Sequence, residues 1–208
     1  MTVAMAEVTP GMHHTTAWDD PATRQAWRRT VLFRCAAVLG WLLGFPAWLF
    51  SVVMTPRWLL VLWLPLLCVG IWYALISMVA ATSLPGIRRV LRVYPWQADI
   101  VDVRSKKNGG TQFVLPDPER PEKSVRLGYG ALIGTGRHFW VRAVRSGQVT
   151  TAWFAGDPRY VGVVAAPGLR NLLWVAQPEA ADARMSPRRR GVSPEARARA
   201  RSAGARVG

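Results

Sequence analysis

Acidic residues, histidine and cysteine are all scarce in this chain. Its 208 residues include 12 Asp and Glu, 3 His and 2 Cys. Two cysteines are too few for a disulfide framework or for a metal site built from several thiolates. No nucleophile, base and orienting acid stand out together, and no two carboxylates have a telling spacing. We therefore expect no enzymatic activity, no cofactor and no metal site.

Lysine is scarce as well, because Lys106, Lys107 and Lys123 are the only ones among the 27 basic residues. The net charge of +15 therefore comes mostly from arginine, and the isoelectric point is about 11.4. A strongly basic protein suits anionic lipid headgroups or nucleic acid. The long apolar runs described next favour lipid, so nucleic acid is the less favoured partner.

Two apolar runs, residues 31–54 and 58–80, dominate the first half of the chain. Each reaches the roughly 20 residues needed to cross about 30 Å of hydrocarbon. The alternative, a buried helical hairpin in a soluble protein, rarely shows helices so long and so apolar on all sides. Only residues 55–57 separate the runs, so the two helices are antiparallel. Residues 21–84 are thus predicted to form a transmembrane hairpin.

Arginine is distributed unequally around this hairpin. Several arginines flank its two outer ends, whereas the connecting turn contains only one. The flanking residues are Arg24, Arg28, Arg29, Arg34, Arg88, Arg89 and Arg92, and the turn residue is Arg57. Because cytoplasmic flanks carry the excess of positive charge, both termini are predicted to be cytoplasmic in a multi-pass protein of the plasma membrane. Arg34, one turn inside the first span, is expected to snorkel to the interface.

Small residues on the first span suggest a helix-packing face. Gly40 and Gly44 form a GxxxG step, which allows close helix approach. The step either contacts a second copy of the chain or packs against the second span near Gly70. Beyond Arg34 the spans contain no Asp, Glu, Lys, Arg or His, and their ionisable side chains are two cysteines and Tyr73. This argues against a secondary transporter, which normally needs charge within the membrane.

The segment 85–96 is basic and amphipathic. Its stripe of Ile87, Val90, Leu91 and Tyr94 recurs at helical spacing. We expect this helix to rest on the anionic inner leaflet with its apolar face down. The residues predicted to bind lipid are Arg88, Arg89, Arg92 and Trp96. The alternative is a positive flank that only orients the protein.

From residue 97 to 178 the hydrophobic pattern changes to period two. Asn108-Gly109 is a strong hairpin signal, and short strands are predicted throughout. One of these strands is predicted at residues 139–144, after the glycine-rich stretch 128–136, which is interpreted as a flexible loop. The predicted fold class is a transmembrane α-helical hairpin plus a small all-β domain, an antiparallel barrel or sandwich. Residues 1–20 and the Arg-rich residues 179–208 are predicted to be disordered tails.

Two stretches, RRVLRVYPW at 88–96 and WFAGDPRYVGVVAAPG at 153–168, resemble uncharacterised two-span integral membrane proteins of actinobacteria. The resemblance covers residues 25–178. It implies the same layout of basic flank, two spans and cytoplasmic β-rich domain. It implies no activity and no catalytic residue.

These features favour a non-enzymatic, membrane-tethered module that binds a protein partner or anionic lipid on the cytoplasmic face. The alternative is an oligomeric subunit of a transporter or channel. That alternative requires a homo-oligomer, because two helices alone do not enclose a pore.

Overall fold

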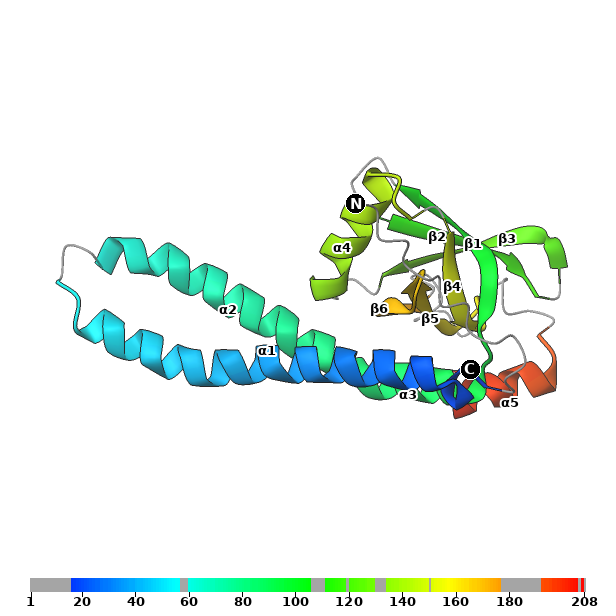
Figure 1. Cartoon of the computed structure of the whole chain (residues 1–208), viewed down its shortest axis with the longest axis horizontal. Coiled ribbons are helices and arrows are strands. Elements are labelled where there is room, and N and C mark those ends of the chain that lie inside the picture. Colours follow the sequence, from blue (N-terminus) through cyan, green and yellow to red (C-terminus); the bar gives the residue numbers. More distant parts are fainter. Residues whose placement is uncertain are drawn as a thin grey trace, which may run out of the picture.

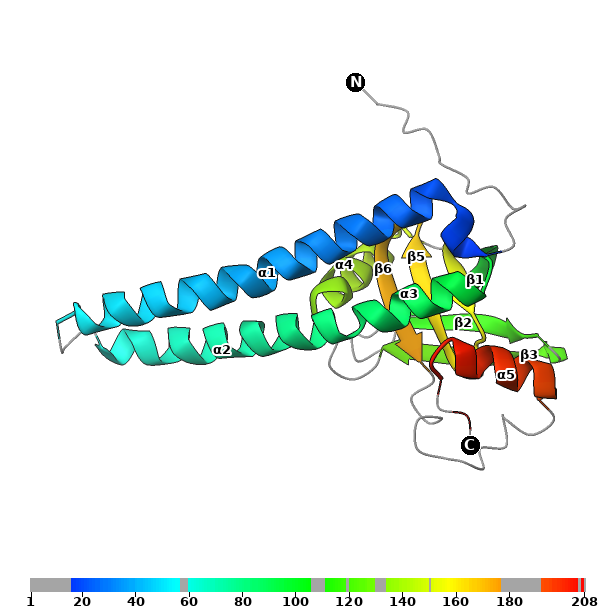
Figure 2. The ribbon, with the colours of Figure 1, turned by 90° about the horizontal axis from the view of Figure 1, so that it is seen from below.

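A helical hairpin projects from a small β domain (Figure 1). The computed structural model describes residues 16–56, 60–105, 111–118, 120–129, 134–149, 151–176, 192–205 and 207. Helices α1 (Pro21–Val53) and α2 (Leu60–Thr82) form the hairpin, and α3 (Leu84–Val93) continues beyond α2 along the β domain (Figure 2). The predicted tail residues 1–15 and 179–191 lie outside the described residues.

Helix α1 begins ten residues before the predicted span. Asp20 caps it, accepting hydrogen bonds from the backbone N–H of Ala22 and Thr23 at 3.0 and 3.2 Å. The preceding 3-10 helix η1 (Ala17–Asp19) is also fixed, because the backbone N–H of Ala17 donates to the Tyr94 carbonyl at 2.9 Å. Residues 16–20 are therefore packed, and the prediction of disorder is wrong for this part of the N-terminal tail.

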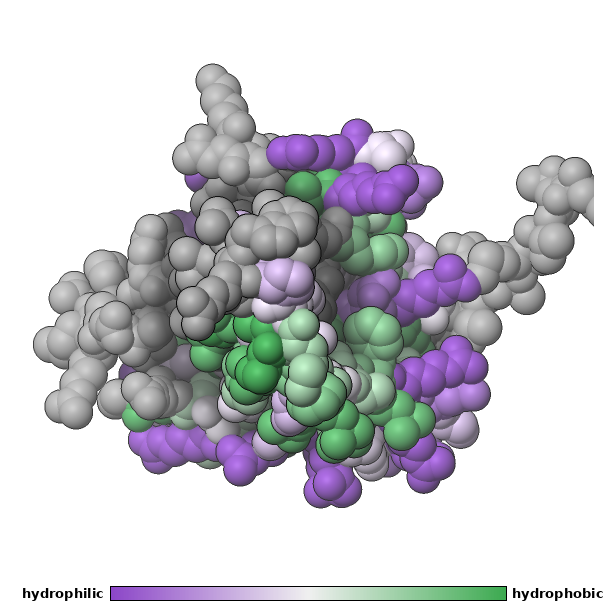
Figure 3. All heavy atoms as spheres, turned by 90° about the vertical axis from the view of Figure 1, so that its left-hand side faces the viewer, coloured by the Kyte–Doolittle hydropathy of each residue, from purple (hydrophilic) through white to green (hydrophobic). Residues whose placement is uncertain are grey.

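The apolar surface of the hairpin is largely exposed. In the most apolar stretches of the two candidate spans, 0% and 11% of the residues are buried. Leu32 and Leu43, for example, are 68% and 74% exposed. Viewed from the turn of the hairpin, hydrophobic residues gather in the middle and hydrophilic ones lie toward the edge (Figure 3). Both helices are thus long and apolar enough to cross a membrane, and their exposure contradicts a buried hairpin.

The two glycines of the GxxxG step face α2 across an open space. Both line the space between the helices, but a Cβ built on Gly40 or Gly44 would have no neighbouring atom within 4 Å. The close contact between the helices uses Gly70, where a Cβ would lie 3.5 Å from the Trp41 ring. Both interpretations of the step, packing against the second span and contact with a second copy, stay predictions.

Six antiparallel strands form the β domain within the described residues. They are β1 (Gln97–Ser105), β2 (Thr111–Asp117), β3 (Arg120–Tyr129), β4 (Thr151–Gly156), β5 (Val161–Ala166) and β6 (Arg170–Ala176). They pair in the order β1-β2-β3-β6-β5-β4, and β4 pairs with β1 again. The prediction of a helical hairpin with a small antiparallel β domain is confirmed.

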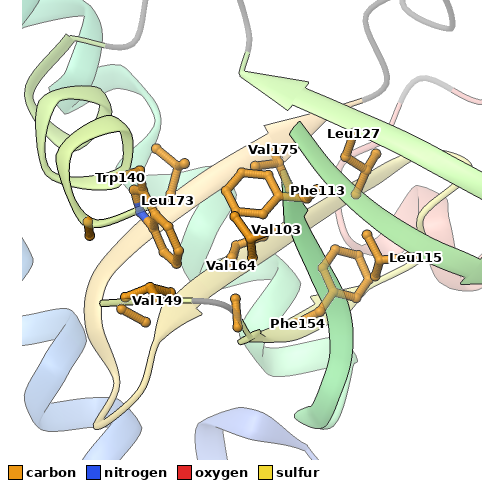
Figure 4. Packing of buried hydrophobic residues seen from close by; sticks show 13 residues of the cluster. Val103, Phe113, Leu115, Leu127, Trp140, Val149, Phe154, Val164, Leu173 and Val175 are labelled. Atoms are coloured by element: carbon orange, nitrogen blue, oxygen red, sulfur yellow. The ribbon is translucent and has the colours of Figure 1, made fainter. Parts of the chain in front are cut away.

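The predicted strand at residues 139–144 is instead part of helix α4 (Gly134–Arg145). Trp140 and Ala143, three residues apart, both point into the β core, and Val144 packs against it. The Trp140 ring meets Phe113 edge to face at a centroid distance of 5.2 Å (Figure 4). The apparent period-two alternation hid this helical spacing, because apolar residues occupy both patterns.

Strands β4 to β6 are buried on both faces, which explains the continuous apolar sequence of β5. Val164 and Phe154 belong to the inner core (Figure 4). Val163 and Ala165 belong to a second cluster, on the outside of the sheet, together with the α3 residues Ile87, Val90 and Leu91. A strand covered on both sides loses the alternating pattern. The apolar stripe of α3 therefore lies on the β domain, and the prediction that it rests on the leaflet is wrong.

The C-terminal tail also contains ordered structure. Helix α5 (Pro194–Ser202) starts at the N-cap Ser193, whose hydroxyl accepts from the backbone N–H of Ala196 at 3.2 Å. After its C-cap Ala203 the chain turns at Gly204, and the Ala205 N–H donates to the Ala200 carbonyl, as in a Schellman motif. Ala200 is buried beside Tyr160. The prediction of a disordered tail is wrong for this segment.

Arg34 joins the hairpin to the β domain. Its guanidinium donates to the Ala80 carbonyl at 2.6 Å, the Ser83 hydroxyl at 2.7 Å and the β6 carbonyl of Leu172 at 3.4 Å. The residue is only 5% exposed. It therefore points inward between α1, the end of α2 and β6, and the expectation that it snorkels outward is wrong.

Replacing Arg34 should loosen this junction. We expect Arg34→Leu to lower the free energy of unfolding by about 2–3 kcal/mol, because hydrogen bonds made by a charged group are lost. Arg29→Leu is the matched control, since Arg29 is exposed on the same helix; it should change stability by about 0.5 kcal/mol or less. Chemical unfolding in detergent, followed by tryptophan fluorescence, measures both. Equal effects of the two variants would contradict the role of Arg34.

Candidate functional site

A basic groove lies between α1 and α3. Its volume is about 320 Å³. We call it the α1–α3 groove; its lining residues are Trp27, Val31, Leu84, Pro85, Arg88, Arg89 and Arg92. It forms because α3 turns its apolar face to the β domain, which leaves the opposite, arginine-bearing face beside α1.

Tryptophan rings hold two of the groove arginines. The Cζ atom of Arg88 lies 5.4 Å from the ring centroids of both Trp18 and Trp27, and that of Arg92 lies 5.4 Å from Trp18. The two indoles meet edge to face at 5.3 Å. Such cation–π contacts are attractive within about 6 Å of a ring centroid. This stack ties η1, the start of α1 and α3 together.

The positive charge of the groove is not neutralised by the described residues. Arg88, Arg89 and Arg92 are exposed, and none of them makes an ion pair or hydrogen bond with another described residue. No carboxylate is among the lining residues. A cluster of guanidinium groups without acidic partners attracts anions. The groove is therefore a candidate site for an anion within the described part of the chain.

Three of the four predicted lipid-binding residues lie in the groove, and Trp96 does not. The Trp96 indole N–H donates to the Thr23 hydroxyl at 2.8 Å, and its ring meets Trp153 edge to face. Trp96 thus fixes α1 to the β domain. Sequence reasoning missed Trp27 as a groove residue, although its spacing of four from Val31 places both on one face of a helix.

The glycine after α5 reaches the same region. A Cβ on Gly204 would lie 3.4 Å from the Arg89 Nη1 atom, so the absence of a side chain leaves room for Arg89. Gly204 also has a positive φ of 86°, which glycine adopts without strain. The C-terminal helix and the groove are therefore in direct contact through Arg89.

A second charged cluster has a structural role. Arg159 is buried and donates to both carboxylate oxygens of Asp157 at 3.0 and 2.9 Å, and it lies 4.0 Å from Asp117. Asp157 also accepts the backbone N–H of Arg159 at 2.9 Å, so its carboxylate caps the turn. Among the described residues, no group of three or more His, Cys, Asp or Glu could hold a metal ion.

Tyr94 is a buried titratable group between α3 and this cluster. Burial, together with the nearby carboxylate of Asp157, raises the pKa of Tyr94 to about 12. Its hydroxyl is buried and has no hydrogen-bond partner among the described residues. The phenol therefore stays neutral over the ordinary pH range.

No family model, curated protein or solved structure matches this chain. The function of the groove therefore has to follow from its own chemistry. Guanidinium groups above a floor of Val31, Leu84 and Pro85 suit a ligand that is anionic at one end and apolar at the other.

The raised pKa of Tyr94 predicts a pH-dependent loss of stability. From pH 10 to about 12 the unfolded chain releases the phenolic proton and the folded chain keeps it. The stability of the folded protein should fall as the pH rises through this window. The Tyr94→Phe variant should lose less stability over the same pH range, because it has no phenol to ionise. Below pH 10 the variant should match the wild type, because the hydroxyl has no hydrogen bond to lose. Melting temperatures against pH test this, and parallel curves above pH 10 would contradict it.

Proposed function

We propose that this chain is a non-enzymatic integral protein of the plasma membrane. Its β domain and both termini face the cytoplasm. Its role is to hold the β domain rigidly at the inner leaflet and to bind anionic lipid there. The support is the exposed apolar surface of α1 and α2 together with the arginines at the base of the hairpin.

The observation that carries the proposal is the position of the α1–α3 groove. Val31 opens the first apolar run, and Leu84 follows the end of α2. Both residues line the groove beside Arg88. The groove therefore stands where the two helices leave their apolar stretches, at the level of lipid headgroups. Basic pockets between membrane helices at this level are typical sites for anionic headgroups.

The proposal extends to the shape of the β domain and to the family of the chain. The β domain is a small barrel rather than a sandwich, which the return of the strand pairing from β4 to β1 supports. The chain also belongs with the actinobacterial two-span proteins that it resembles. Its two motifs pack together: Val90 and Leu91 of the first contact the cluster that contains Val163 and Ala165 of the second.

An oligomeric subunit is the second candidate, and one observation favours self-association. An apolar cavity of about 610 Å³ lies between α1 and α2, and Gly40 and Gly44 are part of its wall. A second copy could approach closely there. The lining contains no ionisable side chain, so the cavity supports an oligomer contact and not an ion pathway. A discrete homo-oligomer with ion flux in liposomes would favour the channel function.

The topology is tested by cysteine labelling in intact cells. In a background without Cys35 and Cys68, a cysteine at Ser124 on β3 should be protected from a membrane-impermeant reagent. A cysteine at Thr55 in the turn should react. Permeabilised cells provide the control, because both sites should then be labelled. The reverse pattern in intact cells would overturn the orientation.

Lipid binding should be visible as a salt-sensitive stabilisation. Phosphatidylglycerol added to the full chain in neutral detergent should raise the melting temperature by roughly 5 °C at saturation. Phosphatidylcholine should raise it much less. Most of the gain at about 50 mM salt should disappear at about 500 mM, because exposed charges are screened. No difference between the two lipids at low salt would overturn the lipid-binding function.

A further inference from the structure

The α1–α3 groove has the dimensions of a site for one ligand and not of a flat adsorbing surface. Its volume of about 320 Å³ is at the lower end of the roughly 300–1,000 Å³ of ligand pockets. We propose that the groove binds the phosphate of a single anionic phospholipid headgroup, an inference that rests on the proposed lipid-binding function. The arginines meet the phosphate, and the glycerol and first methylenes lie over the apolar floor.

Arg88 is oriented for this task before any ligand arrives. Its guanidinium lies over the rings of Trp18 and Trp27, so aromatic contacts restrict its rotamers. Arg88 makes no hydrogen bond with a described residue, so its N–H groups are available to donate in the fork that matches two phosphate oxygens. A side chain ordered in advance loses less conformational entropy on binding. The stack therefore turns a flexible surface arginine into a fixed phosphate ligand.

The wall of the groove also contains an unsatisfied donor. The indole N–H of Trp27 is buried and has no hydrogen-bond acceptor among the described residues. Buried polar groups without partners are rare, and each calls for an explanation. The ester and phosphate oxygens of a headgroup are acceptors of the kind that this donor lacks. This observation is independent of the arginine cluster and also indicates an anionic ligand rich in oxygen.

The floor favours a lipid over an acidic peptide. Val31 and Leu84 flank the two apolar stretches that would lie in hydrocarbon. A lipid headgroup at this depth is already held in the membrane plane by its acyl chains, whereas a peptide would have to enter the interface. A free phosphate ion would meet the arginines but would leave the apolar floor uncovered.

Native mass spectrometry of the full chain, released from detergent with phosphatidylglycerol or phosphatidylcholine, tests the proposal. One phosphatidylglycerol per chain should be retained in preference to phosphatidylcholine. Arg89→Gln with Arg92→Gln should weaken retention about thirtyfold. The matched control is Arg197→Gln with Arg199→Gln on α5, which removes the same charge at exposed residues outside the groove. The control should lose about threefold or less.

A second pair of variants leaves the charge unchanged. Val31→Trp should fill the groove and abolish the retained lipid. Leu32→Trp is its control, because Leu32 is the adjacent residue, is 68% exposed and does not line the groove. It should retain one phosphatidylglycerol. The melting temperatures of all variants, measured without lipid, verify that each is folded.

The results distinguish a single phospholipid site in the groove from general binding of anionic lipid. If the wild type prefers phosphatidylglycerol but the groove and α5 variants lose it equally, the single site is overturned and electrostatic lipid binding stands. If the wild type shows no preference, both proposals fail. Displacement of the lipid by millimolar inorganic phosphate, or tighter binding of an acidic peptide such as oligoglutamate, would also overturn the phospholipid assignment.

Discussion

The burial of α3 against the outer face of β4–β6 is the contact on which the rest of the structure depends. Ile87, Val90 and Leu91 are fully buried there, so the helix has one allowed orientation. That orientation turns its arginines toward α1. Arg34 secures the same junction from the membrane side, through its bonds to Ser83 and Leu172. One apolar contact therefore fixes the β domain relative to the hairpin and also creates the α1–α3 groove.

The packing of α3 at this junction determines where its arginine side chains gather. A helix lying flat on a leaflet would spread Arg88, Arg89 and Arg92 over a surface. Packed between α1 and the β domain, the same helix concentrates them at one groove, where Trp18 and Trp27 restrict Arg88. The apolar stripe of α3 thus packs against the β domain of the same chain. The guanidinium groups stay exposed in the groove, where an anion would meet them.

Sequence reasoning succeeded where a local pattern has one structural meaning, and it failed where a pattern has two. The two apolar runs predicted two long apolar helices, and their length and uniform apolarity favoured membrane spans over a buried hairpin. The strand predicted at residues 139–144 was wrong, because Phe139, Val141 and Ala143 give an apparent alternation, whereas Trp140 and Ala143 have the helical spacing that the structure uses. The signals for α5 were present in Ser193, Pro194 and Gly204, but the arginine-rich composition between them obscured them.

The sequence by itself determined the two long apolar helices, their antiparallel connection, the antiparallel β domain and the place of three arginines opposite the apolar stripe of α3. These follow from hydrophobic period, turn residues and charge placement, which are local properties. Only the tertiary structure decided what the stripe of α3 touches, where Arg34 points and that Trp27 replaces Trp96 in the groove. An amphipathic helix buries its apolar face equally well in lipid or in protein, and only the position of strands 58 or more residues away selects between them.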